Sequence, residues 1–304
     1  MINFKEIEIA DKKWIDPLLA AADMRGSQHN FTNLLAWANI FQYRVARLEE
    51  HLVVKAVSLD GAPCYLYPAG RGELKAVIEA LAEDAAGRGE EFLLAGISKE
   101  NMGVLDRLFP DQFVYTEDRD SSDYIYLLEK LATLAGRKYS AKRNHINHFK
   151  RNNSWSFEPV TLENLAECWA MSVEWCEINS CMFNVRLTDE YCAVRRCFEN
   201  FVELGLEGGL LRVSGRVVAY TMGGKLNSDT YDIHIEKAFD DIQVTYQMIN
   251  REFAALIREK HPELIYVNRE EDMGQEGLRK AKRSYHPVKM EEKYWGKFAG
   301  GARG

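Results

Sequence analysis

The sequence lacks any apolar run that approaches the roughly 20 residues of a membrane-spanning helix. Its first residues, MINFKEIEIADKKW, lack the long apolar region of a secretory signal. It also lacks C-x-x-C pairs and clustered histidine pairs, which are typical of zinc sites, so no metal site is predicted. These absences lead us to expect a cytoplasmic globular protein without a membrane span.

Length and composition predict two domains. The chain has 304 residues, and a domain usually takes about 100–200. Its 46% hydrophobic and 28% charged residues are typical of globular proteins and argue against a disordered chain. Five of the six cysteines fall between Cys168 and Cys197. Because disulfides are rare in the cytosol, we expect these five to be buried free thiols.

The order of predicted elements nearly repeats between the two halves of the chain. In each half, helices precede a β-meander, which is followed by a helix, a strand, a short helix and a strand. This order predicts a mixed α/β (α+β) protein with sheets rich in antiparallel pairs. We place the domains at residues 1–132 and 133–298 and expect a disordered tail at 299–304.

A basic stretch, GRKYSAKRNHINHFKRNN, occupies residues 136–153. It holds six basic residues and no acid, although the net charge of the chain is −7. A helix over 138–151 would place Lys138, Lys142 and His145 about one turn apart. Positive charge in this pattern favours binding to a polyphosphate or an RNA backbone, because it displaces counterions from phosphates. The alternative is a solvated helix that links the two domains.

A second pattern is the strand TYDIHIEKA, residues 230–238. Strict alternation would put Asp232, His234 and Glu236 on one face of the strand. Tyr231, Ile233 and Ile235 would lie on the other. A histidine between two carboxylates is a plausible general-base unit, and three titratable groups are costly to bury without a purpose. The alternative is an exposed sheet face with ordinary charges.

The third pattern is YVNREEDMGQEGLRKAKRSYHP, residues 266–287. A strand ends near Asn268 and an acidic run follows, before Gly274 and Gly277 flank the start of a basic helix. Helix N-termini bind anions through free N–H groups, so this segment is a candidate phosphate site. A local network of salt bridges is the equal alternative.

Four segments together resemble a known family. SQHNFTNLLAWANIF, KRNHINHFKR, HIEKA…INREFA and VNREEDMGQEGLRKAKRSYHP are similar, in this order, to segments of the C-terminal domain of phosphatidylglycerol lysyltransferase. The resemblance runs from about residue 25 to residue 295. It implies two tandem domains of the acyl-CoA N-acyltransferase (GNAT-like) fold, each a mixed, mainly antiparallel sheet flanked by helices. It also extends to the peptidoglycan-bridge aminoacyltransferases.

The resemblance implies transfer of an acyl or aminoacyl group from a phosphate-bearing donor, such as aminoacyl-tRNA, to an amine or hydroxyl. The acceptor would be a small molecule or a lipid. We expect Asp232, His234 or Glu236 to act as the base. Asn268 and Tyr285 would orient the substrate or stabilise the oxyanion. The residues expected to bind the donor phosphates or the substrate are Lys138, Lys142, Arg143, His145, Asn147, Asn268, Asp272, Arg279, Lys280 and Tyr285.

One departure from the acetyltransferase pattern disfavours acetyl-CoA as donor. The stretch before the long helix, FDDIQVTYQM at 239–248, has no glycine for close phosphate approach, and Asp240 and Asp241 would repel phosphate. In the first half, Arg71 lies between glycines in PAGRGELK and is a candidate anion ligand. Two alternatives therefore stay open: a non-catalytic module that binds a nucleotide, tRNA or another anion, and a CoA-dependent N-acetyltransferase. The full-length lipid enzymes have many membrane spans and this sequence has none, so the acceptor need not be a lipid. The sequence does not determine the acceptor or the oligomeric state.

Overall fold

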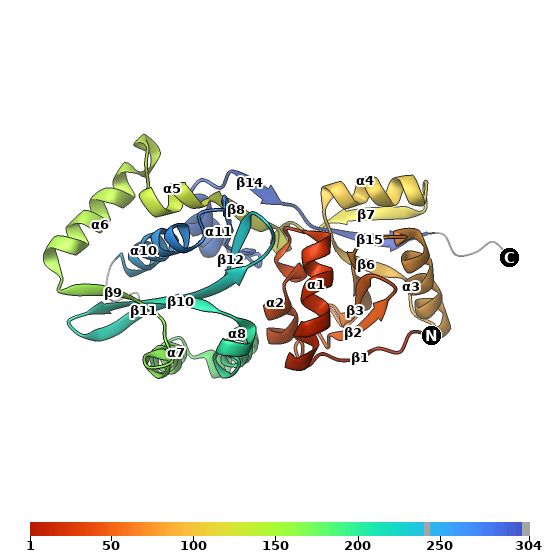
Figure 1. Ribbon diagram of the computed structural model, residues 1–304, viewed down its shortest axis with the longest axis horizontal. Coiled ribbons are helices and arrows are strands. Elements are labelled where there is room, and N and C mark those ends of the chain that lie inside the picture. The colour runs from red at the N-terminus through yellow and green to blue at the C-terminus, as the bar shows by residue number, and fades with distance from the viewer. Residues whose placement is uncertain (240–243, 300–304) are drawn as a thin grey trace. The chain divides into compact units, whose positions relative to one another are not determined.

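The computed structural model describes residues 1–239 and 244–299, which form two compact units (Figure 1). The first unit contains Met1–Asp123, Glu271–Glu276 and the described part of Met290–Gly304, and the second contains Tyr124–Glu270 and Gly277–Lys289. The chain thus divides after Asp123, before the predicted boundary between residues 132 and 133. Both units are also discontinuous in sequence, whereas the sequence analysis expected two continuous domains.

The first unit is a mixed, mainly antiparallel sheet with helices. Its strand order is β1-β2-β3-β4-β6-β15-β7, and β5 pairs with β3. Strands β4 and β6 run parallel, and the other described pairs are antiparallel. The strands are β1 (Lys5–Glu6), β2 (Arg44–Leu48), β3 (His51–Val57), β4 (Pro63–Leu66), β5 (Ala69–Gly70), β6 (Leu93–Ile97), β7 (Phe113–Glu117) and β15 (Tyr294–Phe298). The helices are α1 (Lys12–Ala22), α2 (Phe31–Ala36), α3 (Leu74–Arg88) and α4 (Lys99–Leu108).

Strand β15, from near the end of the described chain, completes the sheet of the first unit. It lies between β6 and β7 and pairs antiparallel with both. The ring of Phe298 on β15 lies 5.0 Å from that of Phe113, 5.7 Å from that of Phe92 and 5.9 Å from that of Phe109. Aromatic contacts of this kind add to the burial that holds a core together. The first unit therefore depends on residues that follow the second unit in sequence.

Two helices of the first unit show how local sequence signals set their ends. The apolar spacing of residues 30–43 predicts a helix capped by Asn30 or Thr32. The side chain of Asn30 accepts a hydrogen bond from the backbone N–H of Thr32 at 2.8 Å and is the cap, but α2 ends at Ala36, well before residue 43. Helix α3 ends at Gly89, which takes the left-handed conformation (φ 71°) that glycine adopts without strain.

The second unit is built on a seven-stranded sheet. Its order is β14-β8-β13-β12-β11-β10-β9, and β12 and β13 pair in parallel. The strands are β8 (Asp123–Leu127), β9 (Trp155–Pro159), β10 (Glu207–Val213), β11 (Arg216–Lys225), β12 (Thr230–Ala238), β13 (Tyr266–Asn268) and β14 (Lys289–Glu291). The helices are α5 (Leu128–Thr133), α6 (Ser140–Asn152), α7 (Leu165–Ile178), α8 (Val185–Glu199), α9 (Phe201–Leu204), α10 (Thr245–Lys260) and α11 (Glu276–Arg283).

Helices cover both faces of this sheet (Figure 1). Neighbouring residues near the end of β12 show the two sides. Glu236 accepts a hydrogen bond from Asn250 of α10 at 3.3 Å, whereas the Lys237 ammonium lies 3.9 Å from the ring centre of Trp175 on α7. The central strand is therefore buried between α10 and α7. Mixed sheets flanked by helices confirm the predicted α+β class in both units.

The cysteines differ from the expectation of free thiols. Cys176, on α7, and Cys181 are joined by a disulfide, with Cα atoms 5.1 Å apart. Cys168 and Cys197 are free and buried, as expected, whereas Cys192 is free and exposed. The chain turns directly after α7, which brings Cys181 back to Cys176, and the spacing of five residues did not reveal this turn.

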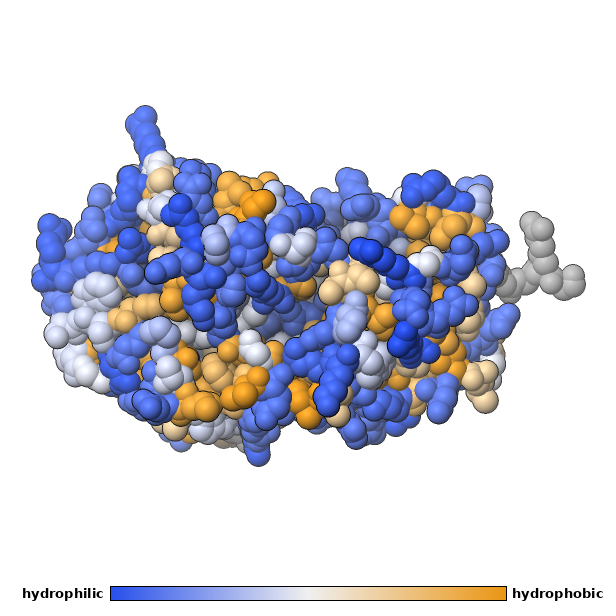
Figure 2. All heavy atoms as spheres, viewed as in Figure 1, coloured by the Kyte–Doolittle hydropathy of each residue, from blue (hydrophilic) through white to orange (hydrophobic). Residues whose placement is uncertain are grey.

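Several sequence expectations concern the surface and the undescribed segments. Within the described ranges, no helix is long and apolar enough to cross a membrane. Figure 2 shows hydrophilic residues over much of the visible face, with hydrophobic residues in separate patches. The expected effect of Asp240 and Asp241 on phosphate binding concerns residues outside the described ranges. The expected disorder of the tail likewise concerns residues 300–304, which are not described.

Candidate active site

Strand β12 carries a β-bulge at His234. The pairing with β11 runs from Met222–Ile235 directly to Gly223–Ile233 and therefore skips His234. The predicted strict alternation breaks there, because Tyr231 and Glu236 both contact α10. The ring of Tyr231 lies 5.9 Å from that of Phe253, and Glu236 bonds to Asn250. Bulges re-aim side chains and are frequent beside active sites.

Gly223 permits the close approach of the two strands at this bulge. A Cβ atom there would lie 2.0 Å from the backbone oxygen of Asp232, whereas a Cβ on Gly224 meets no atom within 4 Å. We expect Gly223→Ala to lower the free energy of unfolding by about 1–3 kcal/mol through overpacking. Gly224→Ala is the matched control and should change it by less than about 0.5 kcal/mol. Thermal unfolding of both variants checks this, and equal stabilities would contradict the assigned register.

Strands β12 and β13 diverge directly beside the bulge. Their parallel pairing covers three residue pairs and ends at Asp232–Asn268, while β12 continues to Ala238. Among the described residues, no strand pairs with this edge of β12 beyond Asp232. The chain that leaves β13 turns there, since the Asn268 side chain accepts a hydrogen bond from the Glu270 N–H at 2.7 Å. We call this opening the β12–β13 wedge.

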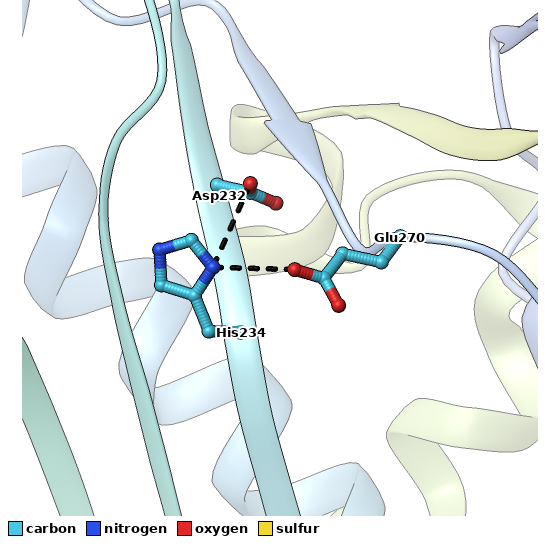
Figure 3. Close-up of side chains that lie close together, drawn as sticks. All are labelled: Asp232, His234 and Glu270. Carbon is cyan, nitrogen blue, oxygen red and sulfur yellow. Dashed lines mark hydrogen bonds and ion pairs between the residues drawn. The ribbon is translucent and has the colours of Figure 1, made fainter. Parts of the chain in front are cut away.

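At the wedge, His234 lies between two carboxylates (Figure 3). Its Nδ1 atom is 3.2 Å from Oε1 of Glu270 and 3.7 Å from Oδ2 of Asp232. The His234 side chain is only 3% exposed and that of Asp232 is fully buried. With Nδ1–H donating to Glu270, the second ring nitrogen, Nε2, is an acceptor. Figure 3 shows Nε2 on the side away from both carboxylates, and it is buried without a hydrogen-bond partner among the described residues.

These three side chains could also hold a metal ion. Asp232, His234 and Glu270 each offer one ligand atom, and the three atoms lie within 4.8 Å of one another. Imidazole and carboxylate are ordinary ligands for Zn²⁺ and related cations. The sequence analysis predicted no metal site and did not connect Glu270 with His234, because the two are 36 positions apart in the chain.

A second cluster surrounds the neighbouring residue, Arg269. Its Nη2 donates to Oε1 of Glu236 at 2.8 Å, and Oε2 of Glu236 accepts from Nδ2 of Asn250 at 3.3 Å. The guanidinium lies 4.9 Å from the ring centre of Tyr285 and 5.7 Å from that of Tyr126. Burial is the largest influence and opposes the charge of Arg269, but the Glu236 carboxylate together with Tyr126 and Tyr285 outweighs it, so the pKa of Arg269 is raised. Glu236 is thus committed to an ion pair and is a weaker candidate base than His234.

Tyr285 links this cluster to the basic helix α6. The Lys142 ammonium lies 3.8 Å from the ring centre of Tyr285 and donates to Oγ of Ser284 at 2.9 Å. Burial raises the pKa of the Tyr285 phenol, so it stays protonated at neutral pH. Burial, followed by the charge of Arg269, lowers the pKa of Lys142 from 10.5 to about 8. Lys142, one of the predicted phosphate ligands, therefore lies beside the Arg269 cluster.

The lowered pKa of Lys142 predicts a stability change with pH. Between about pH 8 and 10.5 the unfolded chain binds this proton more tightly than the folded protein does. The free energy of unfolding should therefore rise with pH across that window, and Lys142→Met should remove this rise. Urea denaturation at several pH values, together with NMR titration of the lysine amines, measures both effects. A Lys142 midpoint near 10.5 would contradict the burial seen here.

The basic stretch forms α6, but its charges are divided between two roles. Arg143 donates to the backbone oxygens of Leu134 and Gly136, where α5 ends, and Lys150 bonds to Glu252 at 2.5 Å. These side chains hold the helix in place, so Arg143 is less available to a donor phosphate than the sequence analysis expected. The stretch also has residues exposed to solvent, among them Arg137, Lys138, His145, Asn147 and Arg151.

The remaining predicted site residues are only partly brought together. Asn268 is buried at the wedge and holds the turn to Glu270. Asp272 belongs to the first unit, where it lies 3.3 Å from Arg119. Arg279 is half-buried on α11 and Lys280 is exposed there. The roles assigned to these residues stay predictions.

The candidate anion ligand of the first unit has a structural contact. Nε of Arg71 donates to the backbone oxygen of Ala21, next to the end of α1, at 2.7 Å. Where β4 and β6 end, the Gln28 side chain donates to the Gly96 oxygen at 3.0 Å, and the His29 ring lies 3.1 Å from the Tyr67 oxygen. The backbone oxygens of Gly96 and Tyr67 therefore already have partners within the chain and are less available to an extended ligand. This favours the second unit as the site of chemistry.

Comparisons with known proteins agree with this architecture. Residues 19–296 match the protein family described as "Phosphatidylglycerol lysyltransferase, C-terminal". The chain belongs to this family. A conserved protein of unknown function from Bacteroides thetaiotaomicron has 40% identity and a TM-score of 0.92, with 98% of this chain and 100% of that chain covered. No curated protein matches the chain.

More distant solved structures share the fold. The C-terminal domain of a putative lysylphosphatidylglycerol synthetase from Agrobacterium fabrum has 14% identity and a TM-score of 0.68, with 98% of this chain and 100% of that chain covered. L-PGS from Bacillus licheniformis has 15% identity and a TM-score of 0.67, with 100% and 95% covered. A further structure, FemX, has 10% identity and a TM-score of 0.63 over 98% and 97% of the two chains. The resemblance inferred from the four segments is thereby confirmed for family and fold.

Proposed function

We propose that the second unit transfers an acyl or aminoacyl group from a phosphate-bearing donor, aminoacyl-tRNA, to an amine or hydroxyl acceptor. The observation that carries this proposal is the buried His234, aligned by Glu270 and Asp232, whose Nε2 has no hydrogen-bond partner among the described residues. A carboxylate that accepts from Nδ1–H fixes the tautomer in which Nε2 takes a proton. Membership of the family supports the reaction class.

In the proposed step, one proton passes through His234 and one ester bond is exchanged for a new amide or ester bond. The acceptor N–H or O–H gives its proton to Nε2 of His234 as its nitrogen or oxygen attacks the donor carbonyl carbon. The ester bond to the tRNA hydroxyl breaks, and that hydroxyl recovers a proton from the imidazolium. Removal of the proton by a positioned base typically contributes about 10²–10⁴-fold to the rate. Asp232 and Glu270 would stabilise the imidazolium that forms between the two transfers.

The wedge and the basic stretch would then bind different parts of the ligands. A divergence of two parallel strands leaves backbone groups of β12 available to an extended ligand. The exposed basic residues Arg137 and Lys138, which directly precede α6, and Arg151 on α6 would meet the donor phosphates and make the affinity fall with salt. Lys142 would approach the donor from the side of Tyr285.

A ligand panel tests the donor assignment. Thermal unfolding and calorimetry would compare lysyl-tRNA and other aminoacyl-tRNAs, uncharged tRNA, CoA and acetyl-CoA at low and moderate salt. A ligand at 100 times its dissociation constant adds about 2.7 kcal/mol to stability. Salt-sensitive binding of aminoacyl-tRNA without binding of CoA is the expected result. Binding of acetyl-CoA alone would replace the proposed donor, and binding of tRNA without any turnover would favour a non-catalytic module.

A further inference from the structure

The buried guanidinium of Arg269 has a nitrogen that the described chain leaves unsatisfied. Nη2 pairs with Glu236 at 2.8 Å, but Nη1 is buried and has no hydrogen-bond partner among the described residues. The Arg269 side chain is only 12% exposed. A buried N–H group of a charged side chain is costly when it is left unpaired, so such atoms are normally satisfied by protein, water or a ligand.

Arg269 is held firmly in this arrangement. Its guanidinium lies near the rings of Tyr285 and Tyr126, and its backbone oxygen accepts from the Lys282 ammonium at 2.5 Å. Its backbone N–H donates to the oxygen of Tyr124 at 3.1 Å. Because both ends of the residue are fixed, Nη1 cannot easily turn to another partner. Donors fixed in this way are preorganised to bind an incoming acceptor.

The charges around Tyr285 favour a negative ligand. Arg269 and Lys142 both lie against its ring, at 4.9 and 3.8 Å. The carboxylate of Glu236 neutralises one of these two cations, while the Lys142 ammonium donates to the neutral hydroxyl of Ser284. The Arg269 cluster therefore carries a positive excess. The opposite holds at His234, where two carboxylates face one imidazole.

We propose that Nη1 of Arg269 binds a carboxylate group of a ligand in the β12–β13 wedge. Arg269 directly follows the last residue of β13 and reaches Glu236 on β12, so Nη1 lies at this opening. The guanidinium lies near two aromatic rings and offers its edge to a ligand, and N–H donors of this kind pair with the oxygens of a carboxylate. The ligand held beside His234 would then carry an acid group, as an amino acid or a peptide C-terminus does.

Titration with acetate tests this site without any assumption about turnover. Lysine amines would be ¹³C-methylated, the Lys142 signal assigned with Lys142→Arg, and its pKa followed by NMR in acetate and in chloride of equal ionic strength. A bound anion near Lys142 stabilises its charged form, so acetate should raise its pKa and chloride should not. Glu236→Gln should tighten acetate binding by about tenfold, because it releases a competing carboxylate from Arg269.

Loss of the site is tested with the double variant Glu236→Gln/Arg269→Gln, which leaves the net charge of the cluster unchanged. Arg269→Gln alone would leave Glu236 buried without its cation. We expect this variant to fold and to show no acetate effect on Lys142. Arg258→Gln, an exposed arginine on α10, is the control and should behave as wild type. The proposal is overturned if acetate leaves wild-type Lys142 unchanged, if the double variant still responds, or if inorganic phosphate binds and acetate does not.

Discussion

His234→Ala is expected to slow group transfer by about 10²–10⁴-fold while leaving donor affinity nearly unchanged. The reason is that Nε2 would handle protons in the reaction, whereas the donor would be held by α6 and by the backbone of the wedge. Single-turnover transfer from labelled aminoacyl-tRNA gives the rate, and calorimetry gives the dissociation constant. A loss of affinity equal to the loss of rate would assign His234 to binding instead.

Two controls test whether the loss of rate comes from His234 acting as a base. His148→Ala removes an exposed histidine of α6 that contacts Asn152 at 2.9 Å, and it should transfer at the wild-type rate. Treatment with a chelator should also leave the wild-type rate unchanged, because the proposed base uses a hydrogen bond between His234 and Glu270. A rate that falls on chelation and returns with one divalent cation would show that Asp232, His234 and Glu270 hold a metal.

Lys293→Met should destabilise the first unit by about 3–5 kcal/mol. The Lys293 ammonium is buried and lies 2.7 Å from Oδ1 of Asp123 and 3.0 Å from Oγ of Ser27. Asp123 also accepts from the backbone N–H of Ser27 at 2.8 Å. Replacing the lysine leaves the Asp123 carboxylate buried without its cation. Urea denaturation combined with hydrogen exchange of amides in the first unit measures the loss.

A second lysine nearby provides the matched control. Lys297, on β15, pairs with Glu91 at 2.7 Å, but both side chains are more than half exposed. Lys297→Met should therefore cost less than about 1 kcal/mol. Adding Asp123→Asn to Lys293→Met should recover part of the stability, because the unpaired charge is gone. Equal losses for Lys293→Met and Lys297→Met would contradict a buried ion pair.

Local sequence signals predicted the elements and the family well. Asn30 caps α2, because a short polar side chain acts within one turn of chain, but α3 ends at Gly89 and not at Gly87, where the helical pattern of residues 73–87 predicts its end. The segment TDEYCAVRRCFENFVELG, residues 188–205, predicts a helix capped by Thr188 or Asp189, which is wrong: α8 begins at Val185 and the Asn184 side chain accepts from the Leu187 N–H. Four recurring segments were sufficient to predict the family and the fold.

Features that depend on distant contacts were not predictable. The bulge at His234 depends on how β11 meets β12, and the strict alternation assumed for residues 230–238 cannot show it. In the sequence, Arg269 and Glu270 are part of one charged run. In the fold, Arg269 bonds to Glu236 and Glu270 bonds to His234, two different residues of β12. The insertion of β15 into the sheet of the first unit likewise joins segments more than 170 positions apart, since Lys297 pairs with Val114.

Charge alone also gave an incomplete view of the basic stretch. Its lack of acids suggested a surface for phosphate, yet Arg143 and Lys150 bond to partners elsewhere in the second unit. A guanidinium that binds carbonyl oxygens at a helix end is indistinguishable in sequence from one that faces solvent. Asn250 was missed for a related reason: a single amide on the long helix α10 carries no motif, and its bond to Glu236 appears only in the fold.

The most direct test of a transferase site in the second unit is a single-turnover experiment with labelled aminoacyl-tRNAs. The wild-type protein would be mixed with a charged tRNA pool and an extract of small molecules and lipids as acceptors. We predict that label moves from tRNA into a new amide or ester product, and that His234→Ala slows this transfer by about 10²–10⁴-fold while still binding the tRNA. If no label leaves any aminoacyl-tRNA, or if label moves only from acetyl-CoA, the proposed donor and function are wrong.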